Sequence, residues 1–109
     1  QMRDGLYKAA FRTGFGGGCG VVVLDAGRVR GGDGSRYYVG RYSSENGRFV
    51  VDLRIEPHTP DPAARSVFGV DQVRVHVEGE GAGDEALLTG AAPNAPHIPF
   101  TVVLSRLSD

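Results

Sequence analysis

Hydrophobic and polar residues alternate along most of this 109-residue chain. In residues 49–56 the odd-numbered positions are all apolar, whereas Asp52, Arg54 and Glu56 occupy even-numbered positions. In residues 73–78 three valines alternate with polar residues in the same way. A period of two residues is that of a β-strand with one buried face, and β-branched and aromatic side chains favour strands. Both segments are therefore predicted to be strands.

The same alternation recurs on either side of these two segments. It is clear near the two ends of the chain and weaker between them, and it marks residues 7–12, 20–24, 29–32, 36–43, 85–91 and 100–105. Short runs rich in Gly, Asn and Asp separate the segments, and Asn46-Gly47 is the strongest of these turn signals because both residue types tolerate positive φ. The sequence thus predicts eight strands, with a tight hairpin at Asn46-Gly47.

Eight short strands joined by turns predict an all-β fold. We expect one domain spanning residues 1–109, folded as an eight-stranded antiparallel up-and-down barrel, because closure removes the unpaired edges of such a meander. A sandwich of two sheets is the structural alternative. The chain has 17 glycines, and glycine allows strands to bend sharply where a small barrel closes. The proline-rich segment 57–70 is predicted to be an irregular crossover loop.

The glycine-rich segment 14–20, with the sequence GFGGGCG, invites comparison with phosphate-binding loops, but its spacing does not fit them. The dinucleotide fingerprint G-x-G-x-x-G would place Cys19 at the final glycine, and residues 21–24 predict a strand instead of the helix that such loops require. We expect a flexible hairpin loop here. Cys19 is expected to be a small packed hydrophobic residue, because none of the three histidines is spaced to contact it.

The charge and composition of the chain limit the classes of partner and chemistry that we expect. Twelve basic and 13 acidic residues give a formal net charge of −1, so no overall field attracts nucleic acid or an anionic membrane. Arginines and tyrosines are interleaved in residues 28–42, but acidic residues are interspersed across the chain. Metal-ligand residues do not cluster in the sequence, and His76 alternates with valines and should face solvent. We expect a non-enzymatic protein without catalytic residues, cofactor or metal, and without nucleic acid or membrane as a direct partner.

The expected location is the cytoplasm. The single cysteine cannot form an internal disulfide and is typical of a reducing compartment. No apolar run is long enough for a spanning helix, and the first residues, QMRDGLYK, lack the apolar region of a signal peptide.

Several predicted strands carry apolar residues on both faces. Neighbouring pairs of this kind are Val21 with Val22, Tyr37 with Tyr38, Leu87 with Leu88 and Val102 with Val103. Only one face of a barrel strand reaches the core, so the second apolar face must be covered by something else. A self-complementary homodimer is the commonest way to cover it. The sequence therefore predicts a homodimer.

Several segments resemble those of the GrlR-like family of small bacterial proteins. They are MRDGLY at residues 2–7, Phe11, GCGVV at 18–22, GRVRGGD at 27–33, YVG at 38–40 and SVFG at 66–69. The resemblance spans most of the chain and consists mainly of glycines, turns and aromatic residues. It implies a calycin-like (lipocalin-like) eight-stranded barrel that forms a dimer.

The resemblance also implies a function. The namesake of the family is a negative regulator of type III secretion genes, in which an acidic run in a hairpin loop is associated with the transcriptional activator that it holds. The matching residues here are Ser44, Glu45, Asn46 and Gly47, with one acidic residue among them. We therefore expect a protein-interaction module that sequesters a transcriptional activator without binding DNA itself. The alternative is a carrier of a small apolar ligand, because calycin-like barrels can enclose one.

Overall fold

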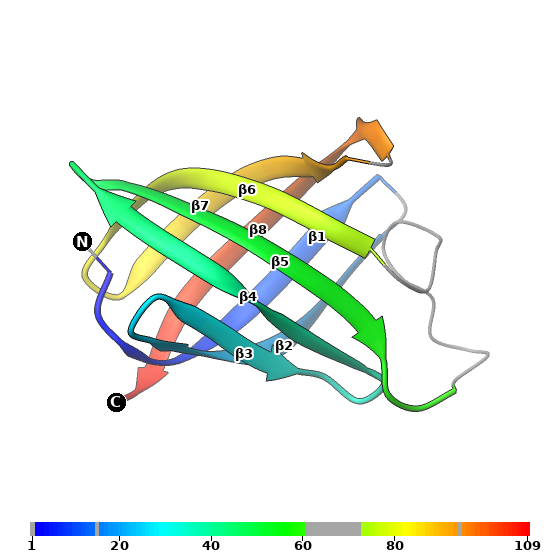
Figure 1. Cartoon of the computed structure of the whole chain (residues 1–109), viewed down its shortest axis with the longest axis horizontal. Coiled ribbons are helices and arrows are strands. Elements are labelled where there is room, and N and C mark those ends of the chain that lie inside the picture. The colour runs from blue at the N-terminus through cyan, green and yellow to red at the C-terminus, as the bar shows by residue number, and fades with distance from the viewer. Residues whose placement is uncertain (1, 15, 61–72, 94) are drawn as a thin grey trace.

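A closed β-barrel forms the body of the protein in the computed structural model (Figure 1). The structure describes residues 2–14, 16–60, 73–93 and 95–109. In chain order the strands are β1 (Gly5–Thr13), β2 (Gly16–Asp25), β3 (Arg28–Gly32), β4 (Arg36–Glu45), β5 (Arg48–Pro57), β6 (Val73–Ala82), β7 (Glu85–Ala92) and β8 (Ala95–Ser108). The described residues contain no helix that is long and apolar enough to cross a membrane.

Each of these strands pairs in antiparallel fashion with the next one along the chain. β8 returns to pair with β1, so the sheet closes into a ring in the order of the sequence. This arrangement confirms the predicted eight-stranded antiparallel up-and-down barrel, and the two-sheet sandwich is wrong. Closure gives every strand of the ring a hydrogen-bonded neighbour on both sides.

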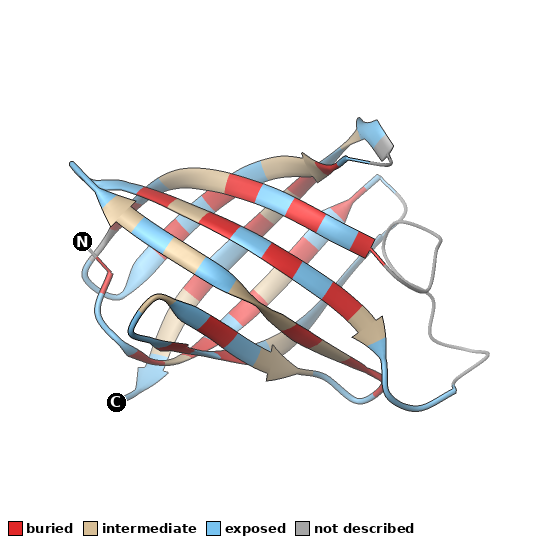
Figure 2. Cartoon of the chain, in the orientation of Figure 1, coloured by how far each residue is buried: buried red, intermediate tan, exposed pale blue. Residues whose placement is uncertain are grey.

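The inward-facing side chains form one apolar core. They include Phe49, Val51, Leu53 and Ile55 of β5 and Val73, Val75 and Val77 of β6. Figure 2 shows the alternation of buried and exposed residues along these strands. The ring of Phe11 lies edge-on to that of Tyr38, with centroids 5.2 Å apart, and stacks on that of Phe100 at 5.8 Å. Side chains thus fill the interior, as expected of an eight-stranded barrel.

The turn between β4 and β5 has the conformation that its sequence predicts. Asn46 and Gly47 have φ angles of 53° and 80°, so both central residues of the two-residue turn have positive φ. Glu45 and Arg48 pair at the ends of the two strands. The predicted hairpin is confirmed, and it fixes the register of β4 against β5.

The glycine-rich segment differs from the expected hairpin loop. β2 begins at Gly16, and residues 16–19 pair with β1 as a regular strand. A Cβ atom on Gly17 would lie 2.7 Å from the carbonyl oxygen of Phe11, so the missing side chain allows the two backbones to approach. The hydrophobic pattern could not reveal this part of the strand, because glycine carries no side chain that marks an inner or an outer face.

Two further glycines lie where neighbouring strands approach too closely for a side chain. A Cβ atom on Gly40 of β4 would lie 2.0 Å from the carbonyl oxygen of Asp52, and one on Gly90 of β7 would lie 1.8 Å from that of His76. Each of these carbonyl groups belongs to the adjacent strand. Close backbone approach of this kind accompanies the strong curvature of a small barrel.

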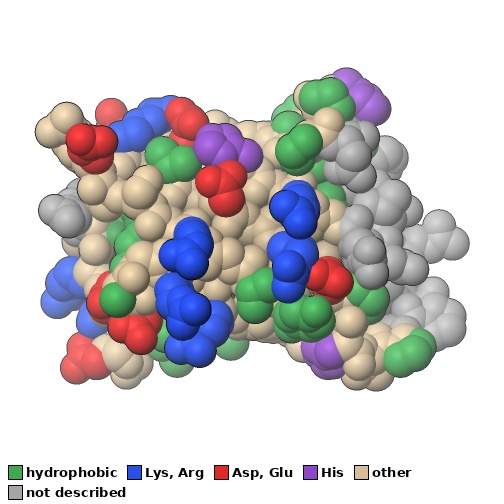
Figure 3. Space-filling model, viewed as in Figure 1, with side chains coloured by type: hydrophobic (Ala, Val, Ile, Leu, Met, Phe, Trp, Pro, Cys, Tyr) green, Lys and Arg blue, Asp and Glu red, His purple; other side chains and the backbone are tan. Residues whose placement is uncertain are grey.

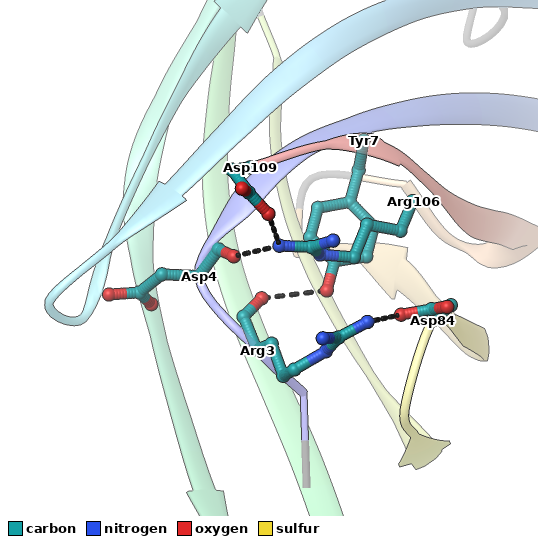
Figure 4. Close-up of polar contacts among 6 residues, drawn as sticks. All are labelled: Arg3, Asp4, Tyr7, Asp84, Arg106 and Asp109. Carbon is teal, nitrogen blue, oxygen red and sulfur yellow. Dashed lines mark hydrogen bonds and ion pairs between the residues drawn. The ribbon is translucent and has the colours of Figure 1, made fainter.

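The N-terminal residues cover one end of the barrel. Met2 is buried and forms a bridge to the turn between β6 and β7. Figure 4 shows polar contacts of the next two residues, Arg3 and Asp4. The hydroxyl of Tyr7 donates a hydrogen bond of 2.6 Å to the carbonyl oxygen of Arg3, and the guanidinium of Arg106 donates one of 3.2 Å to that of Asp4. These contacts tie the start of β1 to the end of β8.

The proline-rich segment 57–70 lies mostly outside the described residues. Pro57 ends β5, and residues 58–60 continue without regular structure. His58 lies against the turn between β3 and β4, with Nε2 3.0 Å from the carbonyl oxygen of Asp33. The remainder of the predicted crossover loop falls on residues that the structure does not describe, as does the SVFG motif at 66–69.

The substitution Gly90→Ala should destabilise the barrel by roughly 3 kcal/mol, because the added methyl group collides with backbone that is fixed in the sheet. Urea unfolding followed by circular dichroism measures this loss. Gly18→Ala is the matched control, since nothing lies within 4 Å of an added Cβ atom at that strand position. The control should change stability by less than about 0.5 kcal/mol. Equal stability of the two variants would contradict the role of Gly90.

Candidate functional site

The partner-binding loop expected from the sequence lies at the tip of the β4–β5 hairpin. Ser44 and Glu45 end β4, and Asn46 and Gly47 form the turn. Ser44 is partly buried, and the other three residues are exposed. Figure 1 shows the tip extending from one end of the barrel. The loop is therefore accessible, with a single acidic side chain to offer a partner.

The space among the described side chains inside the barrel is small. It is lined by Phe11, Leu53, Val75 and other apolar side chains and measures about 20 Å³. That volume has room for about one water molecule, whereas sites for small ligands measure about 300–1,000 Å³. Among the described residues, larger surface features lie on the outer wall.

Cys19 is exposed, which contradicts its expected place in the core. Val22 and Leu24 of β2 are buried, and successive side chains of a strand point to opposite faces. Cys19 and Val21 must therefore point outward. In the part of the chain that the structure describes, no hydrogen bond or ion pair joins Cys19 to a histidine.

One row of outward residues is apolar across four strands. Cys19 of β2 lies opposite Ala10 of β1, which in turn lies opposite Val103 of β8. Val103 lies opposite Leu87 of β7. We call these four residues the apolar row. Leu87 is 57% exposed and Val103 38% exposed, and a contiguous exposed patch of this kind is typical of an interaction site.

The other side of the wall carries a cluster of arginines. Its outward positions hold Arg28 and Arg30 on β3, Arg41 on β4, Arg54 on β5 and Arg74 on β6. We call these five residues the arginine face. Figure 1 shows β3 to β6 on the near side of the barrel, with β1 and β8 behind them. In the same view, Figure 3 shows two groups of basic side chains with uncharged surface between them.

The strand register brings these arginines together as like-charged pairs. Arg28 lies directly opposite Arg41, and Arg54 lies directly opposite Arg74. Like charges in directly opposite positions destabilise an antiparallel sheet. Arg54 forms an ion pair with Glu56. The other four arginines of the face have no hydrogen-bond or ion-pair partner among the described residues.

Charges at the covered end of the barrel, by contrast, are neutralised by nearby partners. Figure 4 shows Arg3 paired with Asp84, and Arg106 paired with Asp109 at 2.8 Å. The hydrogen bond with Arg106 lowers the pKa of the Asp109 carboxyl group. The arginine face differs from this end of the barrel, because four of its five arginines form no ion pair among the described residues.

A groove crosses the arginine face. Its volume is about 470 Å³, and the outward side chains that line it are Val39, Arg41, Asp52, Arg54, Arg74 and His76. This volume lies within the range of sites that hold ligands. Arg41 of the first like-charged pair lines the groove, as do Arg54 and Arg74 of the second, so the groove offers guanidinium donors from both pairs. We take this groove as the candidate functional site.

His76 stands in the groove between two carboxylates. Its Nδ1 atom lies 2.7 Å from Oδ1 of Asp52, and its Nε2 atom lies 2.9 Å from Oε2 of Glu78. The hydrogen bond with Glu78 and then that with Asp52 raise the pKa of His76. The two carboxylates lie on opposite sides of the ring, and no group of three side chains suited to a metal ion exists among the described residues. The sequence predicted the outward direction of His76, but it did not reveal these partners.

The basic and aromatic residues of segment 28–42 separate between the core and the surface. Tyr38 is buried, and its hydroxyl donates a hydrogen bond to Asp33. Burial and this hydrogen bond raise the pKa of Tyr38. Arg36 is buried as well. The arginine face instead includes Arg54 and Arg74, which local sequence reasoning missed because only the register of distant strands brings them there.

Comparisons with known proteins do not assign the chain to a family. No family model matches it, and a search of the curated proteins returned no match. The groove and the apolar row are therefore interpreted from their own geometry.

The environment of His76 predicts a pKa above its ordinary value of about 6.5. Because the folded state stabilises the protonated ring, this contribution to stability is present below about pH 6.5 and is lost as the pH rises through the raised pKa. An NMR titration of the imidazole should show the elevation, and Glu78→Gln should lower the pKa of His76.

Glu80→Gln is the matched control for this titration, because Glu80 lies on the same strand and both ring nitrogens of His76 already have other partners. The control should leave the pKa of His76 unchanged. Equal shifts in the two variants would show that the hydrogen bond with Glu78 is not the cause.

Proposed function

We propose that this protein is a non-enzymatic, homodimeric protein-interaction module. In this proposal the barrel is a rigid scaffold, the apolar row joins two copies of the chain, and the rest of the outer wall receives a partner protein. The exposure of the apolar row is the observation that carries it. Apolar surface that continues across four strands is unfavourable in water unless another surface covers it.

Charges beside the apolar row support a second copy of the chain as the cover. On the adjacent row of the same face, Lys8 lies opposite Ser105, and Ser105 lies opposite Glu85. A basic and an acidic residue therefore flank the central strand β8 symmetrically. Both are exposed, and neither has an ion-pair partner among the described residues.

A two-fold axis along β8 would make this face complementary to itself. It would place Lys8 of one copy opposite Glu85 of the other, and Ala10 opposite Leu87. Val103 would meet its own counterpart on the axis. Contacts in which the same patch serves both subunits are the rule in two-fold symmetric dimers.

The alternative function, a carrier of a small apolar ligand, has less support. A carrier needs an internal cavity of about 300 Å³ or more. The cavity inside this barrel measures about 20 Å³, so side chains of the core would have to move apart before a ligand could enter.

The resemblance to the GrlR-like family extends the proposal to the fold subtype, the process and the location. Under it the barrel is calycin-like, the partner is a transcriptional activator, and the protein works in the cytoplasm. The closed eight-stranded ring supports the first of these. The accessible loop at residues 44–47 supports a second contact with the partner.

Light scattering of the purified protein at micromolar concentration should give about twice the chain mass of 11.5 kDa. Leu87→Glu should give the mass of a single chain, because it places a charge in the apolar contact. Val39→Glu is the control, since it introduces the same charge on the arginine face and should leave the dimer intact. A single-chain mass for the unaltered protein would contradict the proposal.

A cysteine at the expected axis tests the geometry of the dimer. In a Cys19→Ser background, Val103→Cys should form a disulfide-linked dimer under mild oxidation. Thr89→Cys in the same background should not, because Thr89 lies on β7 and would face β1 of the other copy. Equal cross-linking at the two positions would contradict an axis along β8.

A further inference from the structure

We propose that the groove on the arginine face binds an extended acidic segment of a partner protein, with carboxylates four positions apart on one side of the segment. The inference rests on the proposed function as an interaction module and specifies the chemistry of the partner. One carboxylate would lie between Arg28 and Arg41, and another between Arg54 and Arg74. Each would accept hydrogen bonds from two guanidinium groups and offset the repulsion between them.

The spacing of the two arginine pairs fits an extended polypeptide. Arg41 lies opposite Asp52, two residues before Arg54, and the centres of the two pairs are two strand spacings apart across the sheet. Two strand spacings are about 9.6 Å and two residues along a strand about 6.8 Å, so the pair centres are roughly 12 Å apart. On an extended chain, residues four positions apart point to the same side and are about 13 Å apart. Acidic residues four positions apart therefore match the distance between the pairs.

Recognition on the arginine face would occur through side chains. At Arg28, Arg41 and Arg54 the strands β3, β4 and β5 are paired on both sides, so the backbone between the two pairs offers no free edge to which a peptide could add. The guanidinium groups of Arg28, Arg41 and Arg74 are exposed and have no partner among the described residues. They are the donors that remain available to an acidic ligand.

Acidic side chains in the groove favour a polypeptide over a nucleic acid as the ligand. The side chain of Asp52 is 70% exposed, and Glu56 is paired with Arg54. A nucleic acid carries a negative charge on every nucleotide and would bring phosphates against these carboxylates. The net charge of −1 adds no long-range attraction for a polyanion. A polypeptide with carboxylates four positions apart can instead place them beside the two arginine pairs.

Two labelled peptides of equal composition test the groove by fluorescence anisotropy. One contains Glu-Thr-Glu-Thr-Glu and the other Thr-Glu-Glu-Glu-Thr, with identical flanking residues. The alternating peptide should bind at least about threefold more tightly. The double substitution Arg41→Gln/Arg74→Gln removes one arginine from each pair and should weaken binding of the alternating peptide by about tenfold.

Arg12→Gln is the matched control, because it removes one positive charge from the wall formed by β1 and should change affinity by less than about twofold. Arg74→Gln alone also controls for folding. Since it relieves the repulsion with Arg54, it should raise the melting temperature by about 1–4 °C while weakening binding. A lower melting temperature would contradict the like-charge pairing on which the inference depends.

Equal affinity for the two peptides, or equal weakening by Arg12→Gln, would overturn the inference. A single-stranded oligonucleotide of equal net charge is the third ligand. If it binds more tightly than the alternating peptide and loses affinity in the same arginine variants, the face binds nucleic acid and the inference is wrong.

Light scattering of the same samples distinguishes a failure of the groove from a failure of the proposed homodimer. A dimer that does not bind the alternating peptide overturns this inference alone, whereas a monomer that binds it overturns only the self-association.

Discussion

Closure of the sheet is the constraint on which the rest of the structure depends. The pairing of β1 with β8 makes the two ends of the described chain into neighbouring strands and gives every strand of the ring two partners. Because side chains alternate along a strand, closure assigns each residue to the core or to the outer wall. The described inward side chains pack into one core, so the chemistry of the outer wall is what distinguishes one side of this barrel from the other. The apolar row and the arginine face are two such sides.

Much of the fold could be predicted from the sequence, because inner and outer positions differ in hydrophobicity. The alternation in residues 49–56 predicts β5, and the positive φ tolerated by Asn46 and Gly47 predicts the turn before it. The prediction failed for the first residues of β2, where glycines carry no such signal. It also misplaced Cys19. Val22 and Leu24 point into the core, and because side chains alternate along a strand, Cys19 points outward. The pattern is reliable only where side chains distinguish the two faces.

The candidate site was less predictable, because it depends on register between strands. Counting outward from the turn at Asn46-Gly47 places Arg41 opposite Asp52, so one half of the groove was accessible to sequence reasoning. The pairing of Arg54 with Arg74 joins strands separated by a long connection. No local turn fixes that register, and neither residue stands out in the sequence alone. The same limit applies to the apolar row, which combines residues from four strands.

The like-charged pairs link the stability of this wall to its binding chemistry. Each pair costs the free protein on the order of 0.2–1 kcal/mol, which is small beside a net stability of about 5–15 kcal/mol for a domain. The ring tolerates the cost because backbone hydrogen bonds on both sides hold each strand in place. The same repulsion strengthens binding, since an anionic group between two guanidinium groups removes the cost and adds hydrogen bonds. A neutral side chain in place of Arg74 would remove its repulsion with Arg54, making the barrel more stable and the groove a weaker site, so this face cannot maximise both properties.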